Sequence, residues 1–170
     1  MLNRILLIIV LIYGYSVNAA HAIGGTINFT GNLLESTCQI TSGDEKQTVA
    51  MGDFQISGFN GQSGIFQGNQ SVTIRLENCG PGLTGARVVF DGVRDPLYAN
   101  AFKLDGVTGA GLALFEDDGS TLITPGTASR VKAISAQRAT LNFKAKYRSS
   151  SATVTPGSAN AAVDFTIQYQ

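Results

Sequence analysis

The chain has 170 residues, and its 12 Lys and Arg residues are balanced by 12 Asp and Glu residues, so its formal net charge at neutral pH is zero. This length predicts one domain with a real core, and the balanced charge gives no electrostatic footprint for nucleic acid or for an anionic membrane. Small and β-branched residues are frequent, and no stretch beyond the N-terminal segment keeps a helical period over three turns. The composition therefore predicts an all-β protein that binds no nucleic acid.

The N-terminal segment has the three parts of a secretory signal peptide. A basic start ends at Arg4, an apolar run covers Ile5–Ile12, and Ala20-His21-Ala22 has the small-x-small form of a cleavage site. The apolar run is shorter than the roughly 18 to 20 residues that a membrane helix needs. We expect cleavage after Ala22, with Ala19 as the alternative. Residues 1–22 are then removed, and the mature chain leaves the cytoplasm with no integral membrane segment.

The next segment, Ile23–Leu34, alternates between two faces. One face carries Thr and Asn residues, and the other carries Gly25, Ile27, Phe29, Gly31 and Leu33. Such alternation is typical of a β-strand. An ordinary first strand of the domain explains the pattern, but periodicity does not say whose sheet the strand joins.

Cys38 and Cys79 are the two cysteines of the chain. In an exported chain, a pair about forty residues apart is most simply one structural disulfide, and the alternative is two unpaired buried thiols. The mature chain has no further Cys and no His, which excludes four-ligand zinc. We therefore expect a disulfide and no metal.

Catalytic interpretations find little support in the residues. His21 is the one histidine and lies in the segment expected to be removed, which leaves no imidazole to activate a Ser or Cys nucleophile. Two carboxylate pairs, Asp91 with Asp95 and Asp117 with Asp118, lack the spacing of an EF-hand. We expect no enzyme activity and no cofactor.

Four segments with alternating or short apolar patterns indicate half-buried antiparallel strands. They are Gln70–Cys79, Ala86–Val93, Gly111–Glu116 and Ala139–Arg148. Asp117-Asp118-Gly119 predicts a hairpin to Leu122–Ile123, because Asp-Gly favours the positive φ values of a type I′ turn. Turns at intervals of about ten residues indicate a sandwich or a barrel. The row Lys144, Lys146 and Arg148 is interpreted as the solvated side of its strand, with an acidic partner as the alternative.

The last segment alternates to the final residue of the sequence. Val163, Phe165, Ile167 and Tyr169 share one face, and polar residues occupy the other. The pattern predicts a strand. Since chain ends fray unless they are tied into a sheet, we expect this apolar face to be covered by something.

Taken together, these segments resemble the type 1 fimbrial (chaperone–usher) pilin family over essentially the whole mature chain. The similarity rests on motifs in a fixed order, which are Gly25–Gly31, Cys38–Ile40, Val72–Cys79, Phe143–Tyr147, Thr155–Ala161 and Phe165–Gln170. Its most specific parts are the cysteine pair with its flanking strands, Gly157 at the fourteenth position from the end, and the penultimate Tyr169.

The resemblance implies an incomplete immunoglobulin-like β-sandwich that lacks its last strand and is completed by a donor strand from a partner. It implies an N-terminal donor-strand extension over residues 23–35 and a pilin domain over residues 36–170. The donor residues would be Gly25, Ile27, Phe29, Gly31 and Leu33, with the glycines either approaching the acceptor backbone closely or acting only as bends. The groove and chaperone-binding strand would comprise Gly157, Val163, Phe165, Ile167 and Tyr169.

The same resemblance implies partners and a location. The partners would be a periplasmic pilus chaperone, an outer-membrane usher and neighbouring pilin subunits in a homo- or hetero-polymer, and the location a fimbria on the cell surface, reached through the periplasm. The function would be that of a structural subunit that contributes to cell adhesion. The alternatives are a minor adaptor or terminator subunit and, less favoured, a glycan-binding adhesin. Such adhesins carry a lectin domain before the pilin domain, whereas this chain is about half that length and has no Trp for sugar stacking.

Overall fold

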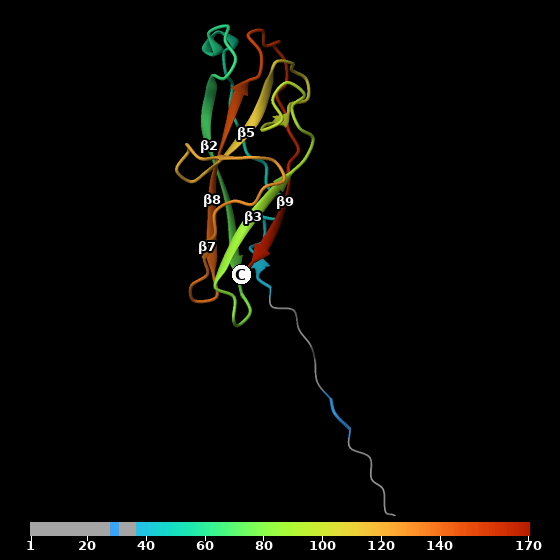
Figure 1. Cartoon of the computed structure of the whole chain (residues 1–170), viewed down its shortest axis with the longest axis vertical. Coiled ribbons are helices and arrows are strands. Elements are labelled where there is room, and N and C mark those ends of the chain that lie inside the picture. Colours follow the sequence, from blue (N-terminus) through green and yellow to red (C-terminus); the bar gives the residue numbers. More distant parts are fainter. Residues whose placement is uncertain (1–27, 31–36) are drawn as a thin grey trace, which may run out of the picture. The chain divides into compact units, whose positions relative to one another are not determined.

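The computed structural model describes residues 28–30 and 37–170. The chain divides into two units, Met1–Leu34 and Glu35–Gln170, and the second unit holds the sheets (Figure 1). The expected signal peptide and four of the five expected donor residues lie outside the described residues, and the described residues 28–30 have no helix or strand. Within the described ranges, no helix is long and apolar enough to cross a membrane.

The larger sheet of the second unit has the strand order β1-β2-β8-β5-β4, with β6 also paired to β5, and all its pairings are antiparallel. Its longest strands are β2 and β8, which pair along most of their length. The bounds are β1 (Gln39–Ile40), β2 (Phe66–Glu77), β4 (Phe102–Lys103), β5 (Ala110–Glu116), β6 (Leu122–Ile123) and β8 (Ala139–Ser149).

The smaller sheet has the order β7-β3-β9, with β3 in the centre (Figure 1). Its strands are β3 (Gly85–Asp91), β7 (Lys132–Ala133) and β9 (Asp164–Tyr169), and a short 3₁₀ helix, η1 (Ile56–Phe59), precedes β2. In both sheets alternate residues point inward, as the sequence pattern predicts.

The core lies between the two sheets. Ile74 and Leu141 of the larger sheet and Val88 of the smaller one are fully buried, and the rings of Phe90 and Phe143 meet edge to face at 4.9 Å. Burial of each such side chain stabilises the fold by about 1.5 to 3 kcal/mol. The two packed antiparallel sheets confirm the predicted all-β sandwich.

Every strand predicted within residues 37–170 is present, but β2 begins at Phe66 rather than at Gln70. The register against β8 shifts between Gln67 and Gln70, where Gly68 has a φ of 79°. This bulge breaks the period-two pattern, so alternation alone finds only the part of β2 that follows it.

The hairpin between β5 and β6 is confirmed, but the predicted type I′ turn is wrong. Of its residues only Gly119 has a positive φ, at 65°. The Gly119 amide donates to the Glu116 carbonyl at 2.9 Å, which closes an ordinary turn before the glycine. The Asp118 carboxylate then accepts bonds from Ser120 and Thr121, and these hydrogen bonds hold its pKa well below the ordinary value. The side chain of Asp118 therefore stabilises the turn that the chain adopts.

Candidate functional site: an open strand edge beside an apolar groove

The strand β9 pairs with β3 on one side, and its other edge has no strand partner among the described residues. Gly85 and Gln170 exchange both backbone hydrogen bonds, at 2.9 and 3.3 Å. In an antiparallel ladder the bonded and non-bonded pairs alternate, so the backbone N–H and C=O groups of Phe165, Ile167 and Tyr169 face away from β3. Among the described residues, no strand pairs with this row of backbone groups.

An apolar groove of about 1480 Å³ runs beside the first part of β9. Its floor consists of core side chains from four strands, which are Val72, Ile74, Phe90, Leu112, Leu114, Ala145 and Tyr147. One wall is formed by residues 45–57, here called the N-terminal wall, and the other by residues 154–163, here called the C-terminal wall. The groove therefore opens onto the core between two walls that contain no β-strand.

The N-terminal wall covers the edge of β2 through side-chain hydrogen bonds. Asp44, immediately before this wall, is buried and accepts a bond from the backbone amide of Arg75 at 2.8 Å, and its two oxygens also bind the Arg75 guanidinium at 2.9 and 2.8 Å. The hydrogen bond from the Arg75 side chain holds the pKa of Asp44 below its ordinary value. Gln47 donates to the Thr73 carbonyl at 3.2 Å. Some backbone groups at the edge of β2 thus have hydrogen-bond partners, whereas the open edge of β9 has no strand partner among the described residues.

The C-terminal wall is held by close backbone contacts with residues 105–109. Asp105 donates to the Asn160 carbonyl at 2.7 Å, and the Tyr147 hydroxyl donates to the Ala159 carbonyl at 2.7 Å. A Cβ atom at Gly157 would collide with the carbonyl oxygen of Gly106. The backbones of Gly157 and Gly106 lie too close together for a side chain at position 157, which explains why glycine stands there.

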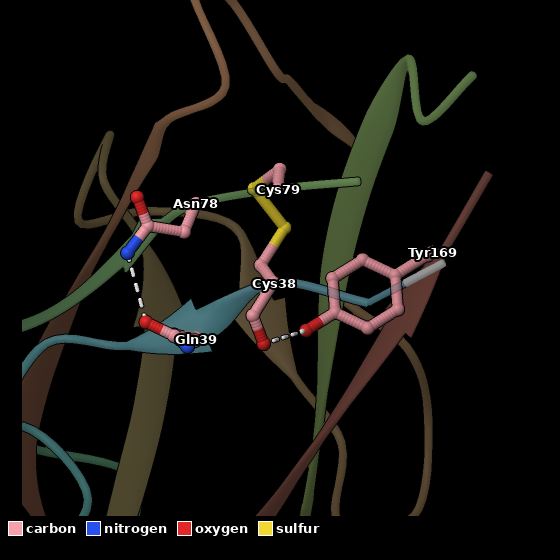
Figure 2. Close-up of a disulfide and its surroundings, with 5 residues drawn as sticks. All are labelled: Cys38, Gln39, Asn78, Cys79 and Tyr169. Carbon is pink, nitrogen blue, oxygen red and sulfur yellow. Dashed lines mark hydrogen bonds between the residues drawn. A yellow bond between two sulfur atoms is a disulfide. The ribbon is translucent and has the colours of Figure 1, made fainter. Parts of the chain in front are cut away.

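The far end of β9 contacts the disulfide region, as Figure 2 shows. Cys38 and Cys79 form the disulfide, which confirms the predicted bridge. The Tyr169 hydroxyl donates to the Cys38 carbonyl at 3.4 Å, and the Asn78 amide donates to the Gln39 side chain at 2.8 Å (Figure 2). The first bond joins β9 to the chain entering β1, and the second joins β1 to the end of β2.

The predicted groove residues therefore occupy three different places. Val163 and Phe165 line the groove, and Gly157 lies in its C-terminal wall. Ile167 and Tyr169 are half-buried against the core further along β9, outside the groove lining. Of the predicted donor residues, Phe29 is described and belongs to the first unit, while Gly25, Ile27, Gly31 and Leu33 lie outside the described residues.

Sequence reasoning missed the N-terminal wall. Met51 and Phe54 pack against a second cluster of buried side chains, formed by Phe59, Leu104, Ala110 and Tyr147. The Phe54 ring meets the Tyr147 ring edge to face at 5.7 Å. Gln70 fixes this segment by donating to the Met51 carbonyl at 3.2 Å. Since the wall is not a strand, it has no alternation that could identify it, and its apolar residues are the only signal in the sequence.

The carboxylates considered for catalysis or calcium do not gather. Asp95 is buried and accepts bonds from the Leu97 and Tyr98 amides, and Asp118 is committed to its turn. In the part of the chain that the structure describes, no group of three or more Asp, Glu, Cys or His residues is placed to hold a metal ion.

An incomplete sandwich with an open edge strand is the architecture of pilus subunits, and comparison with known proteins agrees. The fimbrial protein family model matches residues 27–170. The chain is 31% identical to a type-1 fimbrial protein subunit of Serratia marcescens, over 94% of both chains. It is 32% identical to the fimbria A protein of the same organism, over 99% of both chains. The chain therefore belongs to the fimbrial protein family.

Solved structures show the same fold. An antigen and type I fimbria protein of Burkholderia pseudomallei is 36% identical, with a TM-score of 0.59 over 85% of this chain and 97% of that one. The P pilus rod subunit PapA is 22% identical, with a TM-score of 0.67 over 79% of this chain and all of that one. Family membership makes the chain a structural fimbrial subunit at the cell surface, which confirms the prediction that it is not an enzyme.

Proposed function

We propose that this subunit belongs to a chaperone–usher pilus and polymerises by donor-strand exchange, accepting a strand from a neighbouring subunit beside β9. The observation that carries the proposal is the coincidence of two features at Val163 and Phe165. Their side chains line an apolar groove, and the backbone of Phe165 faces the same open edge. A strand placed there gains hydrogen bonds and buries apolar side chains together.

The incoming strand in this proposal is the segment 23–34 of another copy or of a related subunit. Its alternation gives Ile27, Phe29 and Leu33 to one face, and each contributes about 1.5 to 3 kcal/mol when buried. The backbone hydrogen bonds along β9 add to this stabilisation. The segment carries no charged residue, which suits an apolar groove.

The open edge also explains why assembly would need a chaperone and an usher. An unpaired strand beside exposed apolar surface favours aggregation, so the edge needs a temporary partner before assembly. In this proposal a periplasmic chaperone supplies that strand, and the usher is the place where a neighbouring subunit replaces it. The fibre so formed contributes to cell adhesion.

Within the fibre, we place the chain at an internal position. A terminator has a blocked groove, whereas in the described part of this chain the groove is open between its N-terminal and C-terminal walls. A tip adhesin has no donor segment, whereas the alternating segment 23–34 provides one here. An internal subunit, in the shaft or as an adaptor, needs both features.

The test is the thermal stability of a chain from which residues 23–33 are deleted, measured with and without a synthetic peptide of residues 23–34. We expect the peptide to raise the melting temperature markedly, because binding to the folded state alone stabilises it. The matched control is the same peptide with Ile27→Asn and Phe29→Ser, which keeps length and backbone. Equal melting temperatures with and without the native peptide would show a self-sufficient sandwich and reject the proposal.

A further inference from the structure

The outer face of the larger sheet carries a row of cations along β8. Lys144, Lys146 and Arg148 alternate with core residues, so all three point away from the sandwich. At about 3.3 Å per residue the row spans about 13 Å. Two aromatic side chains, Phe66 and Tyr98, lie at its Arg148 end. We call these five residues the cation–aromatic face.

Apart from the buried Asp95 carboxylate beside Tyr98, little negative charge balances this face. In the described part of the chain, ion pairs join Arg75 to Asp44, Lys103 to Asp105 and Arg130 to Asp118, and none includes a cation of the row. Lys144 instead donates to the Ser71 hydroxyl at 2.9 Å, and Lys146 donates to the Gly119 carbonyl at 2.7 Å. Neutral partners leave the positive charge of both ammonium groups uncompensated.

Exposed carboxylates near the face are few. Among the outward positions of β2, β5 and β8 the one acidic residue is Glu77, at the far end of β2 and close to Arg75. The β5–β6 hairpin adds Asp117 and Asp118, of which Asp118 pairs with Arg130 at 3.0 Å. In a chain of zero net charge, the cation–aromatic face is therefore a local positive patch.

The aromatic end of the face is held in place before any ligand binds. The Arg148 guanidinium stacks on the Tyr98 ring at 3.5 Å. The buried Asp95 carboxylate holds the Tyr98 loop through the Leu97 and Tyr98 amides, and the Ser150 hydroxyl, just beyond β8, donates to the same carboxylate at 2.5 Å. A guanidinium fixed in this way loses little entropy when it binds an anion.

Phe66 provides apolar surface beside the fixed cation. It lies opposite Arg148 in the β2–β8 pairing and is 41% exposed. Its ring meets the Phe115 ring edge to face at 5.3 Å, and Lys146 lies over Phe115 at 4.9 Å. Cations and aromatic rings thus form one connected surface.

We propose that the cation–aromatic face binds an acidic polysaccharide, with the three cations on its carboxylate or sulfate groups and the Phe66 ring against a sugar face. Arg binds such planar or multi-oxygen anions through paired hydrogen bonds. Hydroxyl and amide groups beside the row, on Ser71, Thr73 and Asn142, match the hydroxyls of a sugar chain. Acidic polysaccharides are polyanions that a surface fimbria meets, and repetition of one weak site along a fibre multiplies its effect.

The test measures binding of the purified full chain to immobilised heparin, hyaluronan and uncharged dextran at physiological ionic strength. We expect binding to heparin and hyaluronan but not to dextran, and weaker binding as salt rises. The triple variant Lys144→Gln, Lys146→Gln, Arg148→Gln should lose at least about tenfold in heparin affinity, since charge-assisted hydrogen bonds are removed. The matched control removes the same charge elsewhere, with Arg87→Gln in β3, Lys132→Gln in β7 and Arg138→Gln in the turn before β8, and should bind like the original chain.

Two further variants separate local chemistry from net charge and from folding. Arg148→Lys keeps the charge but loses the planar stack on Tyr98, and should bind with intermediate affinity. Lys144→Gln removes one hydrogen bond to an exposed hydroxyl and should melt like the original chain while binding heparin more weakly.

Three results overturn the proposal. One is equal loss of heparin affinity in the two triple variants, which would mean that net charge alone determines the affinity for heparin. Another is unchanged affinity in the variant of the cation–aromatic face. The third is binding to duplex DNA as tight as to heparin, which would show a polyanion surface with no preference for sugars. Because binding is measured on the unassembled chain, these results do not depend on donor-strand exchange.

Discussion

The hydroxyl group of Tyr169 lies 3.4 Å from the carbonyl oxygen of Cys38, and so joins the last strand to the residue that carries the disulfide. The bond is long, and it connects residues 131 positions apart in the sequence. It closes the sandwich at one end of β9, whereas at the other end the strand borders an open groove. One end of β9 thus stabilises the sandwich, and the other end borders the groove.

Tyr169→Phe tests how much the hydroxyl group of Tyr169 stabilises the sandwich. The ring keeps its packing on the core and loses one long hydrogen bond, so we expect a loss of about 0.5 to 1 kcal/mol in the free energy of unfolding. Urea denaturation measures it. A loss as large as that of Tyr169→Ala would mean that the hydroxyl, rather than the ring, fixes this end of the strand.

Removal of the disulfide should cost considerably more. For the observed sequence separation of 41 residues, restriction of the unfolded chain predicts a stabilisation of roughly 4 kcal/mol. We expect Cys38→Ala with Cys79→Ala to lower the free energy of unfolding by up to this amount, and reduction of the original chain to have the same effect. A reductant should leave the double variant unchanged, which provides the control.

Asp44 predicts a specific pH dependence. Its pKa is lowered from the ordinary value of 3.8 by the hydrogen bond from Arg75, so its ionised form is favoured in the folded state. Its stabilisation is therefore complete above the unfolded pKa and is lost as pH falls through the lower folded pKa. Asp44→Asn should be less stable than the original chain at neutral pH, and the difference should shrink as the pH falls below the ordinary pKa of 3.8. A difference that stays constant with pH would contradict this account.

Gly157→Ala tests the close contact in the C-terminal wall. The new methyl group collides with the carbonyl oxygen of Gly106, so the wall must move. We expect a loss of about 1 to 3 kcal/mol, typical of overpacking, together with weaker binding of the peptide 23–34. Ser158→Ala, at the exposed next residue, is the matched control and should change neither quantity.

Phe165→Ala tests the groove itself. The side chain is half-buried in the isolated chain, so its removal should cost roughly 2 kcal/mol, about half of the loss at a fully buried site. Because a bound strand would cover the rest of the ring, the melting-temperature increase given by the peptide 23–34 should also shrink. Thr166→Ala, on the opposite face of β9, should leave that increase intact. An unchanged increase in Phe165→Ala would place the peptide elsewhere.

The sequence by itself determined the all-β class, the longer strands of residues 37–170 and the cysteine pair, but not the short strands β1, β4 and β7. Alternation depends only on the direction of successive side chains, which is a local property of a strand. It therefore identified the apolar faces of β8 and β9 correctly. It failed where local geometry departs from the regular strand, at the Gly68 bulge and at the Asp118 turn.

The tertiary structure alone decided which strand edge remains open. Strand order and the position of the N-terminal wall arise from contacts between distant segments, such as Gln70 with Met51 and Asp44 with Arg75. Alternation shows that the side chains of Val163 and Phe165 lie on the same face, but it does not show which backbone groups are paired, because pairing depends on the neighbouring strand. Only the arrangement of both sheets shows that the groove lined by Val163 and Phe165 lies beside the edge of β9 that has no strand partner among the described residues.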